Sequence, residues 1–317
     1  MGGTALKRAE SNSHTTIIDI LTQHTQAPME LSLPQDLQPS EESMLQLDAD
    51  YTQGRWCGDT DAVQRILAAA DNNDPCACAY SALLYTYGCC MFAADVTTAV
   101  VYAQKAVLWL DSPHIQDLPV VLFLKATFAY EGIGVAQNDT NAIQLLRNCG
   151  DKSCANALYL LSYVYMQNID TDTTSAQFAM HYLQLAARMD HPQTLCDLAY
   201  CCMVGFGGAE MNHLEALKYY EKAAAHGHGG ALNSIGLMYQ HGTTHVAVDT
   251  TKAYNYYTLA SARLNPAGMY NLGICLQEGT VVPQDLYKAA ALFQDAARFT
   301  LFSRRTLGRI FGVRTLK

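Results

Sequence analysis

Apolar positions in this sequence fall at helical intervals, and the arrangement itself recurs along the chain. The segment that begins at Ala216 places Ala, Tyr and Ala-Ala at offsets of 0, +3 and +7 to +8, which lie on one face of an α-helix. No segment keeps the period-two alternation of a half-buried strand, so the pattern predicts an all-α protein. Related segments follow one another at intervals of 36 to 43 residues and begin at Ala62, Ala99, Ala142, Ala179, Ala253 and Ala289.

A second recurring segment precedes each of the first. In the copy Ile235-Gly236, Tyr239 and Gly242, the large residues share one helical face. The small second residue lets a neighbouring helix approach closely, and the final Gly ends the helix. Each unit is therefore predicted to be two antiparallel helices, which bury their apolar faces only when units stack into a solenoid. The other copies begin at Leu47, Ser81, Lys125, Leu161, Leu198 and Leu272.

Some copies depart from the pattern. The first three are the least regular, and Asp48 stands where the small residue is expected. In the fifth copy Cys202 replaces the tyrosine at the large fifth position, and we expect it to be a small buried hydrophobic residue.

The repeats divide the chain into three parts. Residues 1–43 are rich in Ser, Gln, Thr and Pro with little periodicity, and we expect a mostly disordered N-terminal segment. Residues 44–299 hold the repeats. Residues 300–317 carry five basic residues and no acidic one, and we expect a basic C-terminal capping helix or tail, because a solenoid needs a polar outer end. A docking site for an anionic surface is the second interpretation of this tail.

Composition narrows the class of protein. The chain has 317 residues, a net charge of −9 and only 15% charged residues, which argues against general nucleic-acid binding. No apolar run is long enough for a membrane span, and no signal peptide is evident. The eleven cysteines are therefore expected to be reduced thiols, and we expect a cytoplasmic location, with association with the endoplasmic reticulum as the alternative.

The repeated Leu/Ile-Gly, Tyr, Gly, Lys-Ala, Tyr-Tyr and Ala-Ala positions resemble the Sel1-like repeat, a relative of the tetratricopeptide repeat (TPR), over residues 44–300. The resemblance implies a right-handed α-α solenoid of about seven helix-turn-helix repeats. It also implies a non-enzymatic scaffold or adaptor for protein–protein interactions. One alternative is a structural subunit of a membrane-associated or endoplasmic-reticulum quality-control complex. A weaker one is a hydrolase of the β-lactamase-like Sel1 subfamily, but Ala187, Ala224 and Ala297 occupy places where that subfamily has paired cysteines.

In TPR-like stacks the first helix of each unit lines the concave side, which marks a row of candidate peptide-binding residues. The middle of the row is aromatic and Met-rich, as suits a peptide groove. The alternative is that several of these side chains pack between adjacent repeats. The candidates are Phe123, Tyr130, Tyr159, Tyr163, Met166, Tyr200, Met203 and Tyr270.

Catalytic and metal-binding patterns are not predicted. The sequence has no Gly-rich phosphate loop, nucleophile elbow or His-Glu-x-x-His motif. His226 and His228 are separated from His241 and His245 by a helix about 15 Å long, so we expect solvated loop histidines and not a metal site. We therefore predict no cofactor, no metal and no catalytic residue, with a protein partner whose identity is unknown.

Overall fold

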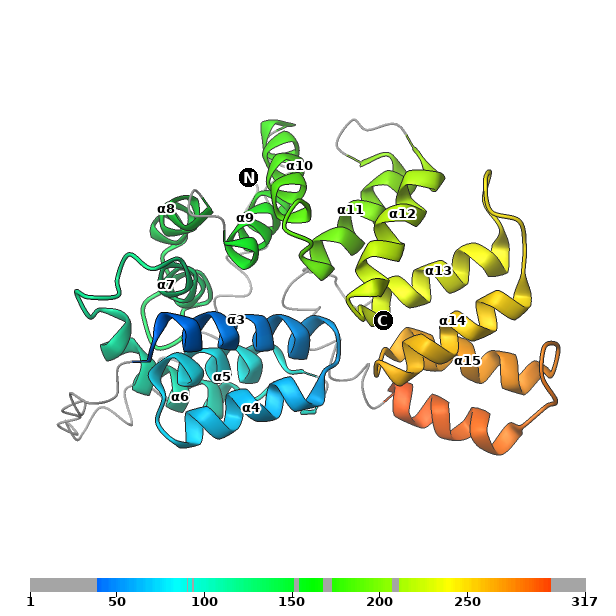
Figure 1. Cartoon of the computed structure of the whole chain (residues 1–317), viewed down its shortest axis with the longest axis horizontal. Helices are drawn as coiled ribbons and strands as arrows, with labels where there is room; N and C mark the ends of the chain where they lie inside the picture. The colour runs from blue at the N-terminus through cyan, green and yellow to red at the C-terminus, as the bar shows by residue number, and fades with distance from the viewer. Residues whose placement is uncertain are drawn as a thin grey trace, which may run out of the picture. The chain divides into compact units, whose positions relative to one another are not determined.

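The computed structural model describes residues 39–89, 91–92, 94–150, 154–167, 173–206 and 211–297. Within them the regular structure is helical, apart from an isolated bridge between Thr243 and Val246. A last helix spans residues 286–297. The others, labelled as in Figure 1, are α3 (Glu41–Trp56), α4 (Thr60–Asp71), α5 (Pro75–Tyr87), α6 (Val96–Leu110), α7 (Pro119–Glu131), α8 (Asp139–Gly150), α9 (Ala155–Gln167), α10 (Thr173–Ala187), α11 (Pro192–Val204), α12 (His213–Ala225), α13 (Gly229–His241), α14 (Thr250–Ala262) and α15 (Pro266–Glu278).

The helices follow one another as packed pairs from α3 with α4 to α13 with α14, and α15 packs on helix 286–297 through Gly273 and Tyr270 against Phe293. We call the odd-numbered member of each pair its first helix and the other its second helix. In the described part of the chain this gives seven helix-turn-helix units, each in contact with the next. The all-α solenoid of about seven repeats is therefore confirmed. The capping helix predicted at 300–317 and residues 1–38 lie outside the described residues.

Polar caps start most of these helices. Asp59, Asp95 and Asp249 accept backbone N–H bonds at the starts of second helices. Asp74 and Asn265 do the same in front of a proline at the start of α5 and α15. Each cap of this kind typically contributes about 1 kcal/mol to stability. The residue at which each helix begins is therefore determined by local sequence as well as by packing.

Glycines act as the sequence predicts at two kinds of position. Gly205 and Gly279 end α11 and α15 in the left-handed conformation, with φ of 71° and 69°. Gly236 allows the second helix of its unit to approach, because a Cβ there would lie 2.5 Å from Cε1 of Tyr257. The predicted role of the small residue is confirmed at this unit.

Stacked tyrosine pairs join the two helices within three of the units. In each pair a first-helix ring lies almost parallel to a second-helix ring, with centroids 5.7 Å apart and planes within 7–12°. Such stacking adds to the area that the rings bury. The pairs are Tyr85 with Tyr102, Tyr165 with Tyr182, and Tyr239 with Tyr256.

No helix in the described ranges combines the length and the hydropathy needed to cross a bilayer.

Candidate protein-binding face

Helix α3 lies against the first helices of several other units. It contacts α5, the first helix of the next unit, and also α7 and α11. Its apolar side is formed by Met44, Leu47 and Tyr51, which are buried. The Tyr51 ring lies 5.0 Å from the Tyr80 ring and 6.5 Å from the Phe123 ring, centroid to centroid. Part of the face formed by the first helices is thus covered by a helix of the same chain.

A buried polar network fixes α3 on this face. Asp48 accepts hydrogen bonds from the Tyr80 hydroxyl at 2.6 Å and from Asn156 Nδ2 at 2.9 Å. The residue that broke the small-residue pattern is therefore the anchor of α3 to α5 and α9. Burial is the main cause that raises the pKa of this carboxyl, while the two hydrogen bonds act in the opposite direction.

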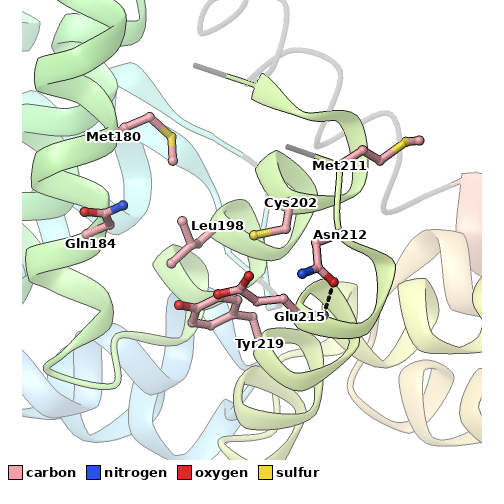
Figure 2. A pocket seen from close by; sticks show the side chains of 8 residues that line it. All are labelled: Met180, Gln184, Leu198, Cys202, Met211, Asn212, Glu215 and Tyr219. Atoms are coloured by element: carbon pink, nitrogen blue, oxygen red, sulfur yellow. Dashed lines mark hydrogen bonds between the residues drawn. The ribbon is translucent and has the colours of Figure 1, made fainter. Parts of the chain in front are cut away.

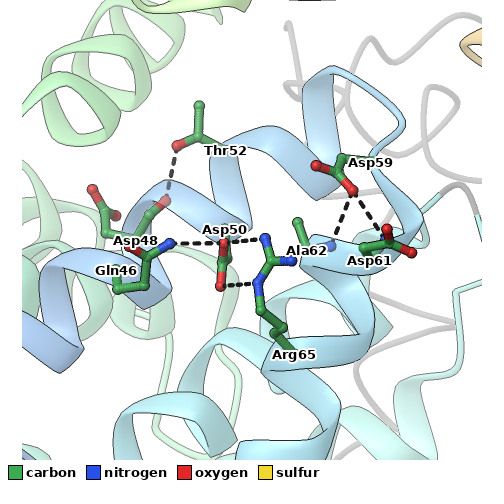
Figure 3. Close-up of polar contacts among 8 residues, drawn as sticks. All are labelled: Gln46, Asp48, Asp50, Thr52, Asp59, Asp61, Ala62 and Arg65. Atoms are coloured by element: carbon green, nitrogen blue, oxygen red, sulfur yellow. Dashed lines mark hydrogen bonds and ion pairs between the residues drawn. The ribbon is translucent and has the colours of Figure 1, made fainter.

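An ion pair fixes α3 to its own partner helix (Figure 3). Arg65 of α4 donates to Asp50 from Nε at 3.0 Å and from Nη2 at 2.7 Å. Gln46 donates to the same carboxylate at 3.1 Å. Asp50 is buried and Arg65 is half exposed, so the guanidinium group lies between the carboxylate and the solvent. This bidentate geometry fixes the orientation of α4 relative to α3, in addition to the attraction between the two charges.

Two histidines begin first helices, and both are buried. Nδ1 of His191 and of His228 accepts a backbone N–H at the starts of α11 and α13. Nε2 of each ring is left to donate to a side-chain amide, Asn156 Oδ1 at 3.1 Å for His191 and Gln193 Oε1 at 2.8 Å for His228. The expectation of a solvated loop histidine is wrong for His228, because its ring caps a helix inside the stack.

Gln193 connects His228 to a carboxylate. Gln193 Nε2 donates to Asp197 Oδ1 at 2.8 Å. Burial lowers the pKa of His228 to about 4 and raises the pKa of Asp197 to about 7, the latter opposed by hydrogen bonds from Gln193 and Tyr159. The neutral ring is thus the stable form in the fold. The sequence held a signal for these caps, since Asp74, His191, His228 and Asn265 share one register position.

The predicted face residues lie in different environments. Phe123 is only 4% exposed and sits beneath α3, as in the alternative of packing between repeats. Tyr159 is partly buried and stacks on His191, with ring centroids 5.1 Å apart. Tyr200 and Tyr270 are 61% and 54% exposed. The remaining candidates, all partly buried, are Tyr130, Tyr163, Met166 and Met203.

The exposed apolar side chains of this face belong to the last three first helices. Tyr200 lies on α11 and Tyr270 on α15, and between them α13 carries Leu237, which is 36% exposed. We call these three residues the open face. Sequence reasoning missed that α3 covers the earlier part of the row, because no local pattern shows which distant helices a segment contacts.

Thiols and histidines do not gather into a metal centre within the described ranges, where no group of three or more potential ligands is found. Cys78, Cys201 and Cys202 are buried. Burial raises the pKa of Cys78 to about 11 and that of Cys201 to about 12, which opposes formation of the thiolate that metals and electrophiles require.

Stacked helix pairs that each contact the next define a helical-repeat protein. The family follows from the repeat sequences. The Sel1 repeat model matches five stretches that span about half of the chain, so the chain belongs to the Sel1 repeat family. Such repeats generally serve protein–protein interaction. The matches begin within the third unit and cover residues 127–148, 155–191, 192–228, 230–263 and 266–298.

Individual proteins resemble parts of the chain. Chitin synthase regulatory factor 2 of Schizosaccharomyces pombe is 32% identical over 95 residues, which are 30% of this chain and 18% of that protein. The chain thus matches less than a fifth of this relative's length. A Sel1 repeat protein from Oxalobacter formigenes has a similar structure, with a TM-score of 0.54, 25% identity, and coverage of 64% of this chain and 82% of that one.

A second solved structure supports the fold. A protective antigen of uropathogenic Escherichia coli strains, described as displaying an SLR fold, aligns with a TM-score of 0.50 and 18% identity. The alignment covers 86% of this chain and 65% of that one.

Proposed function

We propose that the protein is a non-enzymatic adaptor that binds a helical segment of another protein on its open face. The observation that carries the proposal is the exposure of Tyr200, Leu237 and Tyr270 on consecutive first helices. Rigid aromatic side chains that are already ordered lose little entropy on binding, and they are common anchors in interfaces.

The contacts of α3 support a helix as the bound element. Met44, Leu47 and Tyr51 stand at positions i, i+3 and i+7 and form one apolar stripe against the first helices. Recognition of an amphipathic helix uses the same spacing. The open face continues the type of surface that α3 covers, so a partner helix with a similar stripe suits it. The S. pombe relative is named a regulatory factor, and regulation through binding agrees with an adaptor.

Photo-crosslinking tests the proposal. Benzoylphenylalanine at position 200 is expected to capture a polypeptide from an extract of the source cells, and Tyr270→Glu is expected to abolish that capture. Tyr270 is more than half exposed, but its ring lies 5.4 Å from that of Phe293, centroid to centroid. The change should therefore lower the melting temperature only modestly, and circular dichroism checks that the variant is folded.

The matched control is Leu259, which is 52% exposed on the second helix α14. Neither a crosslinker at 259 nor Leu259→Glu should affect the partner. Equal capture from positions 200 and 259, or capture from position 200 that survives Tyr270→Glu, would contradict the proposal.

A further inference from the structure

In the unit of α11 and α12 the second-helix tyrosine of the stacked pair is present without its partner ring. Tyr219 of α12 occupies the register position of Tyr102, Tyr182 and Tyr256, but its first helix has Cys202 in place of the partner ring. Within the described residues no aromatic ring stacks on Tyr219. Four other units have a tyrosine at the first-helix position, Tyr51, Tyr85, Tyr165 and Tyr239, and here that position holds a much smaller side chain.

A cavity of about 360 Å³ lies at this position, between α10, α11 and α12. Figure 2 shows Tyr219 on one side, Cys202 above it, and Met180 and Gln184 on the facing helix. About 150 Å³ is enough to hold a benzene ring in a protein interior, and typical ligand pockets begin near 300 Å³. The cavity therefore has room for a phenol side chain.

The neighbouring unit shows what would hold the hydroxyl group. There Arg147 of α8 donates a hydrogen bond to the hydroxyl of Tyr165, the ring that stacks on Tyr182. Arg147 stands five residues after Ala142, and Gln184 stands five residues after Ala179, which is the same register position. Gln184 lines the cavity, so by register its amide would take the role that Arg147 has toward the hydroxyl of Tyr165.

We propose that this cavity, the 202 pocket, binds the tyrosine side chain of a partner polypeptide. Tyr219 would stack on the ring, Gln184 would hydrogen-bond to its hydroxyl, and Met180 would contact its edge. The pocket is lined by residues of α10, α11 and α12 and by Met211 and Asn212, which precede α12, and it shares no residue with the open face. It is therefore a second site, and the tests of this site and of the proposed adaptor face are independent of each other.

The first test uses p-cresol, which is the tyrosine side chain as a free molecule. In protein labelled with ¹³C at the methionine methyl groups, p-cresol should shift the Met180 signal upfield in a saturable way, because a nearby ring shields the methyl group. Cyclohexanol should produce no upfield shift. Absence of a saturable Met180 shift with p-cresol would overturn the proposal, whether the pocket is too open or already filled by the chain itself.

Two substitutions of Cys202 distinguish filling of the 202 pocket from the mere loss of the thiol. Cys202→Tyr introduces the ring that four other units have at this position, so it should raise the melting temperature, place the Met180 signal upfield without ligand, and abolish the p-cresol response. Cys202→Ser leaves the pocket open and should retain the response. If Cys202→Tyr does not fold, Tyr219→Ala must abolish the response instead. A response that survives in a folded Cys202→Tyr protein places the ligand elsewhere and overturns the proposal.

Further arms test the hydroxyl contact and the source of the ring. Gln184→Leu should reduce the preference for p-cresol over toluene severalfold, and an unchanged preference would contradict the role of Gln184. N-acetyltyrosine amide should compete with p-cresol, whereas N-acetylleucine amide should not. Binding of p-cresol without competition by the tyrosine amide would show a site for small phenols and would overturn the assignment to a polypeptide.

Discussion

At the scale of single residues, a few positions determine how closely the two helices of a unit approach. Gly236 lies against the ring of Tyr257, so that a Cβ would stand 2.5 Å from Cε1 and 2.7 Å from Cδ1. A methyl group at this distance forces the buried ring or the helix to move. The sequence pattern predicts this contact, because it places a small residue where a neighbouring helix approaches.

Gly236→Ala is expected to lower the free energy of unfolding by about 1–3 kcal/mol, the usual cost of overpacking a core. Urea unfolding monitored by circular dichroism measures it. Tyr257→Leu in the Gly236→Ala background should recover part of the loss, because Leu183 and Leu146 stand at the same register position in other units. Additive effects of the two changes would contradict a direct clash.

His228 gives the fold a dependence on pH. Its pKa is lowered to about 4 in the fold against about 6.5 in an unfolded chain. Between these values the unfolded state binds more protons, so the stability contribution is full above pH 6.5 and is lost as the pH falls toward 4. Asp197, whose pKa is raised to about 7, acts with the opposite sign in the range from about 4 to 7.

His228→Asn isolates the histidine contribution, because Asn265 performs the same cap at the start of α15. Relative to the variant, the wild-type protein should lose about 2 kcal/mol of stability between pH 7 and pH 5. Urea unfolding at the two pH values measures the difference. Parallel pH profiles for the two proteins would show that the ring is not held neutral by the fold.

At the scale of elements, α3 is held by polar contacts as well as by its apolar stripe. Asp48 joins it to α5 through Tyr80 and to α9 through Asn156. Removing a buried acceptor leaves two donors unsatisfied, which costs more than the hydrogen bonds themselves contribute.

Asp48→Ala is therefore expected to destabilise the protein by about 2–4 kcal/mol, whereas Asp48→Asn keeps an acceptor oxygen and should cost less. Thermal unfolding of both variants provides the comparison. If the Asn variant is as unstable as the Ala variant, the negative charge and not the acceptor is the essential feature.

At the scale of the whole described molecule, α3 makes the array differ from a chain of nearest neighbours. In a simple solenoid each unit contacts only those beside it, but α3 contacts first helices as far away as α11. Gly58, in the turn after α3, also lies against the Arg263 backbone, since a Cβ on it would be 2.5 Å from the Arg263 carbonyl oxygen. Stability should therefore be shared between units that are distant in sequence.

Tyr51→Leu removes the ring contacts of α3 with Tyr80 and Phe123. Hydrogen–deuterium exchange should then rise not only in α3 to α5 but also in α7, α9 and α11. The control Leu276→Ala, in the core of α15, should change exchange mainly in α14, α15 and helix 286–297. Changes that stop at α5 in the Tyr51 variant would show that the array behaves as a nearest-neighbour solenoid.

Much of the fold could be predicted because its signals are local. The Ala-Tyr-Ala-Ala stripe, the terminal glycines and the acidic caps each act within about one turn of a helix. The register also marks Cys202 as a replacement for tyrosine, but it does not reveal the cavity that the missing ring leaves. The size of a cavity depends on whether neighbouring helices close in, which a repeat pattern does not specify.

The sequence by itself determined the number and kind of repeats, the helical class and the residues that start and end the helices, because each depends on residues within one unit. Only the tertiary structure decided that α3 covers part of the first-helix face, that Tyr200 and Tyr270 remain open, and that His228 is buried. The contact between Asp48 and Asn156 joins residues 108 positions apart. Such contacts follow from how successive units are rotated against one another, and that rotation is the sum of many packing interactions that no single repeat encodes.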